Sequence, residues 1–258
     1  MQDTSLIQNY DTIYSMPHTT EAFLEIWSSD GSSGSLIGTI PNKNIIELKT
    51  VRGLFNENDF SIGCCFAGEI DAKFFALDEN DEEVEIPRMA MIKVFIQLRA
   101  RDTNLVSGRL QKGEFFIDTR SIEKSSGALK IHGFDAMLKA ENQYVDDGNT
   151  YIDPEIDPPD MNVVIQIAKA IGVFVDDRTS EVITGNSDIG TPIGYSMREI
   201  LSGIGIPYCA NWCISDKGEL LAVSAIVTEP EYGLLVDNTS GAFITIGEEN
   251  GEAVRIIV

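Results

Sequence analysis

The sequence predicts a mainly β protein in which an N-terminal β-barrel is followed by a smaller α+β domain. Short segments with alternating apolar side chains recur from residue 21 to about residue 140, separated by turns rich in glycine, serine and aspartate. An acidic, proline-rich connector follows, and beyond it the apolar residues recur at helical spacing. A chain of 258 residues is long enough for one large or two small domains, and we expect two.

The clearest predicted strand covers residues 93–99. Val94, Ile96 and Leu98 alternate there with more polar side chains, which is the period of a strand with one face on a core. Residues 23–27 are predicted as an earlier strand, and residues 28–35 as the loop after it. Further strands are expected at residues 45–49, 64–66, 73–77, 115–117 and 129–132. Their spacing favours a barrel or a sandwich, of which a barrel fits best.

Two acidic stretches interrupt this pattern. Residues 78–85 carry six acids in eight positions, and because such a cluster cannot be buried unpaired, we predict a solvated hairpin tip or loop. The alternatives are that these acids line a lumen or collect a divalent cation. Residues 146–160 form the proline-rich connector, which predicts domains of residues 1–145 and 146–258. A calcium loop is disfavoured in the connector's second part, residues 153–160, because it lacks the glycine that an EF-hand turn requires.

The second domain is predicted to contain two short helices and a β-hairpin. Asp160 is the expected N-cap of the first helix, and Gly172 is its expected stop. The hairpin is predicted at residues 212–223, with its turn at residues 216–218. The apolar stripe of the first helix consists of Val163, Val164, Ile167, Ala168 and Ile171.

The start of the second helix is marked more fully. Ser196 and Glu199 have the spacing of a capping box, and Tyr195 and Ile200 stand at the positions of a hydrophobic staple. We therefore expect this helix to begin directly after Ser196.

The charge balance restricts the partners. The chain has 41 acidic and 19 basic residues, a net charge of −22. Such a surface repels phosphate, so ordinary nucleic-acid binding is disfavoured, whereas a channel that DNA crosses without sticking is compatible with it. Solubility alone is the other interpretation. No window approaches about 18 uninterrupted apolar residues, so no membrane span is predicted. Residues 1–5 lack the features of a secretory signal, which predicts synthesis in a cytoplasm.

No residue is assigned to catalysis, to a cofactor or to a metal. The adjacent pair Cys64 and Cys65 cannot easily form a disulfide with each other. Cys209 and Cys213 have a spacing that could hold metal, but neither of the two histidines, at positions 18 and 132, lies in a Cys/His cluster. We expect four reduced, mostly buried thiols.

Two phrases of the sequence resemble those of phage and prophage tail hub proteins, which include baseplate hubs and the N-terminal regions of tail-associated proteins. The first phrase comprises residues 113–117 (GEFFI) and 129–137 (LKIHGFDAM). The second comprises residues 196–201 (SMREIL), Asn211 and residues 216–220 (DKGEL). The order of a β-barrel before an α+β part is also that of the family.

The resemblance implies a virion structural protein of the tail tip, with residues 1–145 as its β-barrel tail-hub domain. It also implies a trimer whose barrels surround the tail channel, with the distal tail ring protein, the tape measure and spike or fibre proteins as partners. DNA would pass without specific binding, and the family supplies no catalytic residues. Family hubs usually contain a second barrel. This chain instead ends in an apolar segment, residues 253–258, whose exposed edge would need a partner.

Two other functional classes stay open. A cell-wall hydrolase fragment, either peptidase or glycosidase, would need a catalytic set; some carboxylate pair is inevitable among 41 acids, and His132 is expected to be structural. A host-surface adhesin that binds glycans would need an exposed aromatic cluster. Trp27 and Trp212 lie in apolar, strand-like contexts, for which placement in a core is the better interpretation.

Overall fold

The computed structural model describes residues 8–28, 34–53, 61–103, 105–144, 159–187 and 194–225, together with the backbone of residues 247–249 and 252–254. The chain divides into two compact units, Met1–Val223 and Ser224–Val258. In the second unit, β10 (Gly247–Glu249) pairs antiparallel with β11 (Glu252–Val254). Most of the predicted loop at residues 28–35, nearly all of the connector and residues 255–258 lie outside the described residues. The boundary near residue 145 therefore stays a prediction.

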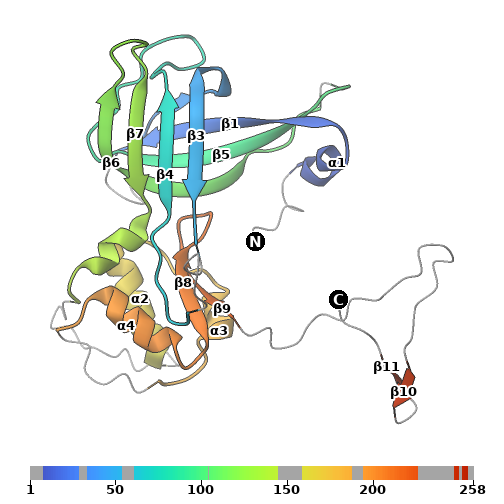
Figure 1. Ribbon diagram of the computed structural model, residues 1–258, viewed down its shortest axis with the longest axis vertical. Coiled ribbons are helices and arrows are strands. Elements are labelled where there is room, and N and C mark those ends of the chain that lie inside the picture. The colour runs from blue at the N-terminus through green and yellow to red at the C-terminus, as the bar shows by residue number, and fades with distance from the viewer. Residues whose placement is uncertain are drawn as a thin grey trace. The chain divides into compact units, whose positions relative to one another are not determined.

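A seven-stranded antiparallel sheet dominates the first unit (Figure 1), which confirms the mainly β fold class. The strand order is β2-β1-β5-β6-β7-β4-β3. A short helix, α1 (Tyr10–Tyr14), precedes the sheet. The strands are β1 (His18–Trp27), β2 (Leu36–Ile40), β3 (Ile45–Val51), β4 (Glu69–Phe74), β5 (Met91–Ala100), β6 (Leu110–Ile122) and β7 (Leu129–Phe134).

Closure of this sheet into a barrel is not confirmed. In the described part of the chain no ladder joins the two edge strands, β2 and β3. They are separated in sequence only by Pro41 and the 3-10 turn η3 (Asn42–Asn44), so the chain passes from one edge of the sheet to the other without pairing them. Side chains from strands near both edges of the sheet nevertheless share one core. Its largest members include Leu24, Ile40, Phe74, Ile92, Phe115 and Ile131.

The predicted strands are partly right. In β5, Val94 and Leu98 are buried as expected and Ile96 is half-buried. Residues 64–66 are not a strand: Cys65 forms only an isolated bridge with Trp212, because this segment lies beside β8 (Ala210–Ile214) rather than in the large sheet. The strand expected at residues 73–77 is misplaced: β4 runs from Glu69 to Phe74, so only residues 73 and 74 of the predicted range lie in it.

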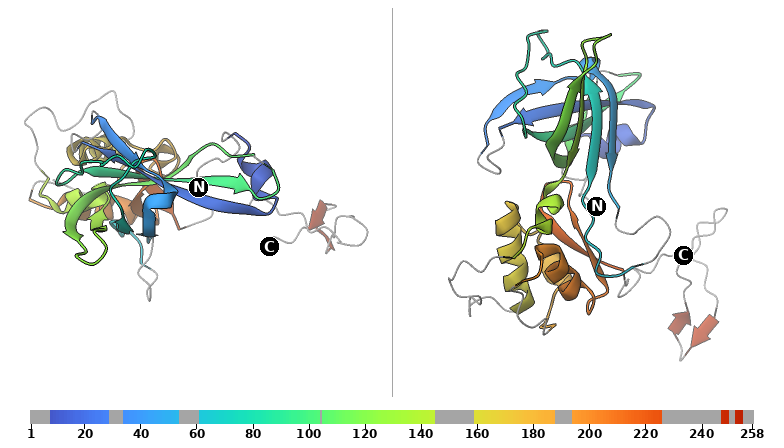
Figure 2. Two further views of the ribbon diagram at one scale, coloured as in Figure 1. Left: turned by 90° about the horizontal axis from the view of Figure 1, so that it is seen from above. Right: turned by 60° about the vertical axis from the view of Figure 1, so that its left-hand side comes forward.

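Helices and a β-hairpin lie against one end of the sheet (Figures 1 and 2). Their elements are η4 (Ala136–Glu141), α2 (Pro159–Ile171), α3 (Thr179–Val182), α4 (Met197–Gly205), β8 and β9 (Leu220–Ser224). The predicted stripe of α2 is buried along its whole length, and Trp212 of β8 is fully buried in the same core. No helix in the described ranges is both long and apolar enough to cross a membrane.

The helix starts differ in how well they follow the sequence signals. Ser196 Oγ accepts from Glu199 N at 3.2 Å and Ser196 N donates to Glu199 Oε2 at 2.7 Å, so the capping box of α4 is confirmed. Tyr195 is 56% exposed, although Ile200 is buried as the staple predicted. The prediction that Asp160 caps α2 is wrong. The helix already includes Pro159, and Asp160 is buried, with Oδ2 accepting from Ser187 N and from the Tyr208 hydroxyl.

Candidate functional site

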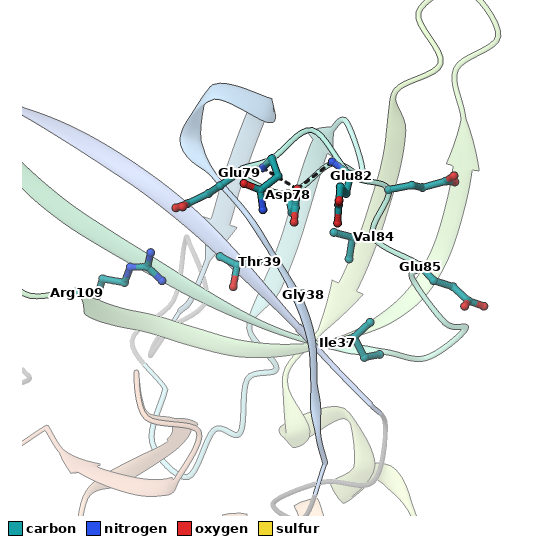
Figure 3. Close-up of a pocket in the computed structure, with 11 residues that line it drawn as sticks. Ile37, Gly38, Thr39, Asp78, Glu79, Glu82, Val84, Glu85 and Arg109 are labelled. Carbon is teal, nitrogen blue, oxygen red and sulfur yellow. Dashed lines mark hydrogen bonds between the residues drawn. The ribbon is translucent and has the colours of Figure 1, made fainter.

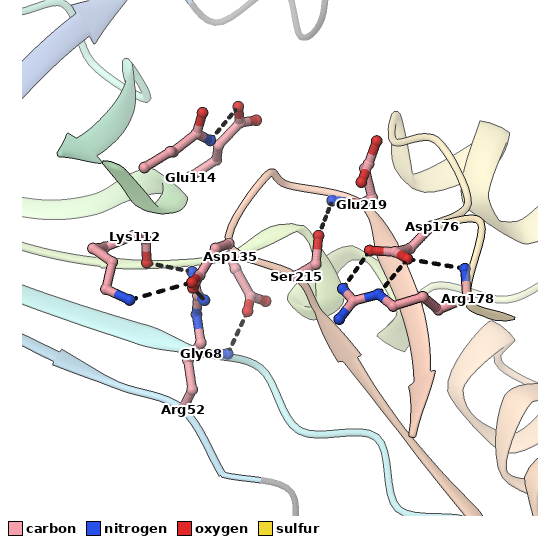
Figure 4. A network of polar contacts seen from close by, with 11 residues as sticks. Arg52, Gly68, Lys112, Glu114, Asp135, Asp176, Arg178, Ser215 and Glu219 are labelled. Atoms are coloured by element: carbon pink, nitrogen blue, oxygen red, sulfur yellow. Dashed lines mark hydrogen bonds and ion pairs between the residues drawn. The ribbon is translucent and has the colours of Figure 1, made fainter. Parts of the chain in front are cut away.

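The two phrases of the sequence meet where the sheet joins the helices and the hairpin. The first phrase lies on β6, on β7 and at the start of η4, and the second lies on α4, on β8 and in the β8–β9 turn. We call this place the junction and define it by Arg52, Gly68, Lys112, Asp135 and Asp216, most of which are drawn in Figure 4. These residues come from five separate parts of the chain.

Arg52 connects the sheet to the hairpin. It follows β3 directly, and its Nη1 donates to the carboxylate of Asp216 in the β8–β9 turn. Its Nη2 donates to the Lys112 carbonyl of β6 at 2.7 Å, as Figure 4 shows, and its guanidinium lies 5.6 Å from the centre of the Phe115 ring. Lys112 Nζ lies 3.4 Å from the same Asp216 carboxylate. One guanidinium therefore links an edge strand, a central strand and the hairpin turn.

Asp135 holds the passage from β7 into η4. It is 2% exposed; Oδ2 accepts from Gly68 N at 2.7 Å and Oδ1 from Met137 N at 2.9 Å. Burial raises the pKa of Asp135 to about 7, because the loss of hydration outweighs these two N–H donors and the nearby guanidinium of Arg52. The junction thus contains a carboxyl group that changes charge near neutral pH.

Two glycines of the phrases allow a close approach of chain segments. A Cβ on Gly133 of β7 would overlap the Phe116 carbonyl oxygen of β6. Gly218, in the hairpin turn, has φ +84° and would place a Cβ against the Glu114 carboxylate. Gly133 is therefore required by the close approach of the β6 backbone, and Gly218 is favoured by its positive φ.

Asn211 fixes the segment that runs beside β8. It is 1% exposed, Oδ1 accepts from Cys64 N at 2.8 Å, and Nδ2 donates to the Ser61 carbonyl at 2.9 Å. The neighbouring Trp212 donates Nε1 to the Leu201 carbonyl at 2.6 Å. The phrase residues described here use their polar atoms to join elements, which makes the junction suited to holding a fixed geometry.

The cysteines and histidines do not meet in the described residues, where no group of three or more His, Cys, Asp or Glu side chains could hold a metal ion. All four cysteines are free thiols, as predicted, but the expectation that most are buried is wrong: only Cys65 is buried, and the other three are half-buried. Burial raises the pKa of Cys65 to about 12 and that of Cys213 to about 11, so both thiols stay protonated at neutral pH. His132 Nδ1 lies 3.0 Å from Asp71 Oδ1, and its ring meets Phe134 edge-on. The absence of catalytic, cofactor and metal residues stays a prediction.

The acidic residues 78–85 form a solvated loop, as predicted. Asp78 Oδ1 accepts from Asn80 N at 2.8 Å and from Glu82 N at 2.9 Å, which shapes the turn. A groove of about 510 Å³ is lined by this loop and by β2, and Arg109 lies at its rim (Figure 3). Val84 is an exception in the loop, because it is buried in the core of the sheet together with Ile86.

Arg52 is the residue that sequence reasoning missed. Its partners Lys112 and Asp216 lie 60 and 164 positions away, so no local pattern marks it. The paired phrases were the only indirect signal, since they contain the hairpin turn to which Arg52 binds.

No family model and no curated protein matches this chain. Among solved structures it is similar to the 43 kDa tail protein of prophage MuSo2 from Shewanella oneidensis, with 15% sequence identity and a TM-score of 0.46. The similarity covers 84% of this chain and 59% of that one, so the chain spans less than two thirds of that protein's length. A TM-score this low does not establish a shared fold.

Proposed function

We propose that this protein is a structural component of a phage or prophage tail tip, or baseplate hub, and not an enzyme. The observation that carries the proposal is the convergence of two distant phrases of the tail-hub pattern on one junction. Asp135, Asn211 and Asp216 all belong to these phrases, and each connects two or more elements. A part that transmits force through a virion needs such a fixed joint between its sheet and its helices.

The free sheet edges support assembly with other subunits. The outer sides of β2 and β3 have no backbone partner among the described residues. On β3, Ile46 is 50% exposed and Val51 is 45% exposed. Unpaired edges of this kind are where another chain adds a strand. We propose that closure into a barrel, and the ring of three subunits around the channel, are completed in the assembly.

The acidic surface fits a wall that DNA passes. With a net charge of −22 the chain repels phosphate, so acids that face a channel would keep DNA from adhering. The distal tail ring, the tape measure and a spike or fibre are the proposed neighbours. Residues 1–145 would form the ring, and residues 146–258 would dock the neighbours.

The location of the protein in particles tests this proposal. The chain, extended by a short epitope tag, is produced in the cells that carry its gene, and purified particles are labelled with gold-conjugated antibody for electron microscopy. We expect label at the distal end of the tail. Absence of the chain from purified particles, or label spread along the tail, would overturn the proposal.

One observation favours a second candidate, a glycan-binding adhesin. The rings of Tyr10 and Tyr14 stack with centres 6.1 Å apart, His18 lies 5.7 Å from Tyr14, and Tyr14 is 65% exposed. Exposed aromatic rings are platforms on which sugars stack. If this candidate is right, a glycan panel will show saturable binding that Tyr14→Ala abolishes; binding that the variant keeps, or no binding, contradicts it.

A further inference from the structure

The outer edge of β2 borders a groove. Among the described residues, β2 pairs with β1 on one side and has no backbone partner on the other. Ile37, Gly38 and Thr39 of this strand line the groove of about 510 Å³, and most of its other lining residues come from the acidic loop, residues 78–85 (Figure 3). Neighbouring strands lie about 4.8 Å apart, so a strand added to β2 would occupy this space, which we call the β2 groove.

The acidic loop is fixed against β2. Val84 is 8% exposed and belongs to the core of the sheet, and a Cβ on Gly38 would lie 2.8 Å from Val84 Cγ1. Glycine at position 38 therefore makes room for the side chain that anchors the loop. The bonds from Asn80 N and Glu82 N to the Asp78 carboxylate shape the turn. The groove is thus formed before a partner arrives, which lowers the entropic cost of binding.

The charges that line the β2 groove are almost all negative. Five acids line it, against a single basic residue, Arg109. Apart from Asp78, which shapes the turn, these acids are exposed, and none of them forms an ion pair within the described residues; they are Glu79, Glu82, Glu83 and Glu85. Four carboxylates are therefore available to a basic partner.

Two cations near the groove are engaged with other residues. The guanidinium of Arg109 lies 4.2 Å from the centre of the Phe23 ring, and its Nη1 is 3.8 Å from Glu25 Oε1. Lys43 Nζ pairs with Asp81 at 2.8 Å. Neither cation neutralises the four glutamates of the groove.

A third cation, Arg120, lines a separate pocket to which Glu83 and Glu85 also belong. Its guanidinium donates to the Ile86 carbonyl, and it forms no ion pair in the part of the chain that the structure describes. The surroundings of the β2 groove therefore keep an excess of negative charge.

The arrangement of the acids favours one kind of occupant. The carboxylates of Glu79 and Glu85 lie apart along the loop rather than around one point (Figure 3), and no described group of three such side chains could hold a metal ion. A second copy of this chain would bring 41 acids against 19 basic residues, so like charges would meet. An extended basic segment fits both features, because its alternate side chains are spaced about 7 Å apart.

We propose that the β2 groove binds an extended segment of a neighbouring protein, rich in lysine or arginine, which adds as a strand to the free edge of β2. Backbone hydrogen bonds would hold the strand, and the four glutamates would select basic over acidic side chains. The inference concerns β2 alone, and contacts between copies can form at the free edge of β3. The partner's place in a tail rests on the proposed function. The chemistry of binding does not, and it is measurable on the isolated chain.

Three blocked pentapeptides test the inference by NMR titration of the full 258-residue chain: Lys-Val-Lys-Val-Lys, Glu-Val-Glu-Val-Glu, and the first peptide methylated at every backbone nitrogen. The methylated peptide keeps the charge but cannot donate hydrogen bonds to a strand, so it measures non-specific attraction to a chain of net charge −22. We expect saturable amide shifts at residues 36–40 and 78–85 with Lys-Val-Lys-Val-Lys, and affinity at least about 5-fold weaker for the other two.

Paired substitutions assign the binding to the groove. Glu82→Gln combined with Glu83→Gln is expected to weaken the binding of Lys-Val-Lys-Val-Lys about 5-fold. Glu47→Gln combined with Glu181→Gln is the matched control: it removes the same charge from two exposed acids outside the groove and should leave the affinity nearly unchanged. An unchanged amide spectrum away from the substituted positions shows that each variant is folded.

Several results would overturn the inference. The first is that the methylated peptide binds as well as Lys-Val-Lys-Val-Lys, that both substituted pairs weaken binding equally, or that no saturable shift occurs. Saturable Ca²⁺ binding at residues 78–85 that excludes the peptide would assign the acids to a cation. Dissociation of an oligomer by the peptide would assign the β2 edge to a second copy. The tail-tip proposal would survive each of these results, because it is tested on particles.

Discussion

The two ends of β4 lead into regions of opposite character. Before its first residue lies the junction, where the Gly68 N–H is bound by buried Asp135 and where Arg52 connects β3, β6 and the hairpin. After its last residue the chain enters the acidic loop, most of whose acids are exposed, beside the unpaired edge of β2. The difference indicates that the two ends of β4 have different roles. The junction fixes the internal geometry, and the acidic loop stays accessible to other molecules.

The largest effect is expected at Arg52. Arg52→Met keeps most of the stem but removes the ion pair with Asp216 and the bond to the Lys112 carbonyl. Both side chains of the pair are 24% exposed, so we expect a loss of about 2–3 kcal/mol in the free energy of unfolding, measured with urea. The matched control, Arg99→Met, removes a pair with Glu21 on the sheet in which Arg99 is 47% exposed and Glu21 is 23% exposed, so it should cost less than Arg52→Met. Equal losses in both variants would remove the distinction between the two regions.

Gly133→Ala should have the next largest effect. The added methyl group would overlap the Phe116 carbonyl oxygen, so strands β6 and β7 must shift, at a cost of about 2 kcal/mol. Gly127→Ala is the control in the turn between these strands: its φ of +74° is unfavourable for alanine, but open space surrounds it, and the expected cost is about 1 kcal/mol. Thermal and urea unfolding of both variants measure the difference, and a smaller loss in Gly133→Ala would contradict the close-approach argument.

The buried carboxyl group of Asp135 predicts a pH dependence. Its pKa is about 7 in the folded chain and about 3.9 when unfolded, so the folded state holds the proton more tightly. This contribution to stability is fully present below about pH 4 and is lost as the pH rises through 7. Urea unfolding between pH 5 and 7 should show a decrease of roughly 1 kcal/mol per pH unit relative to Asp135→Asn.

The Asp135→Asn variant also carries a cost that does not depend on pH, because its amide NH₂ must face one of the N–H donors of Gly68 and Met137. The comparison therefore uses the slope of stability against pH. Parallel slopes in the two proteins would show that Asp135 does not titrate in this range.

The smallest effect is expected in the acidic loop. Glu82→Gln combined with Glu83→Gln alters two exposed side chains and should change the free energy of unfolding by no more than about 0.5 kcal/mol. A loss above about 1.5 kcal/mol would mean that these acids hold the fold together, and the contrast with the junction would be wrong.

Features encoded within a few residues could be predicted from the sequence. The capping box places both of its partners within four positions, so Ser196 and Glu199 gave the start of α4 correctly. The stripe from Val163 to Ile171 and the alternation in β5 needed only the periods of a helix and a strand.

Features that depend on distant partners could not be predicted. Arg52 meets Asp216 across 164 positions, and residues 64–66 looked like a strand because nothing local shows that they lie beside β8. The acidic loop misleads in another way. Its charges indicate solvent exposure, yet Val84 within it belongs to the core. Closure of the sheet is likewise a property of its two edges, and neither edge alone determines it.

The solution mass of residues 1–258, measured by light scattering over a range of concentrations, tests most directly whether the free edges of β2 and β3 join copies of the chain. If three subunits form the proposed ring, we expect a trimer of 28.3 kDa chains. Ile46→Lys, which places a charge on the free edge of β3, should weaken that trimer if this edge forms the contact. A monomer at every concentration would contradict self-assembly through the free edges.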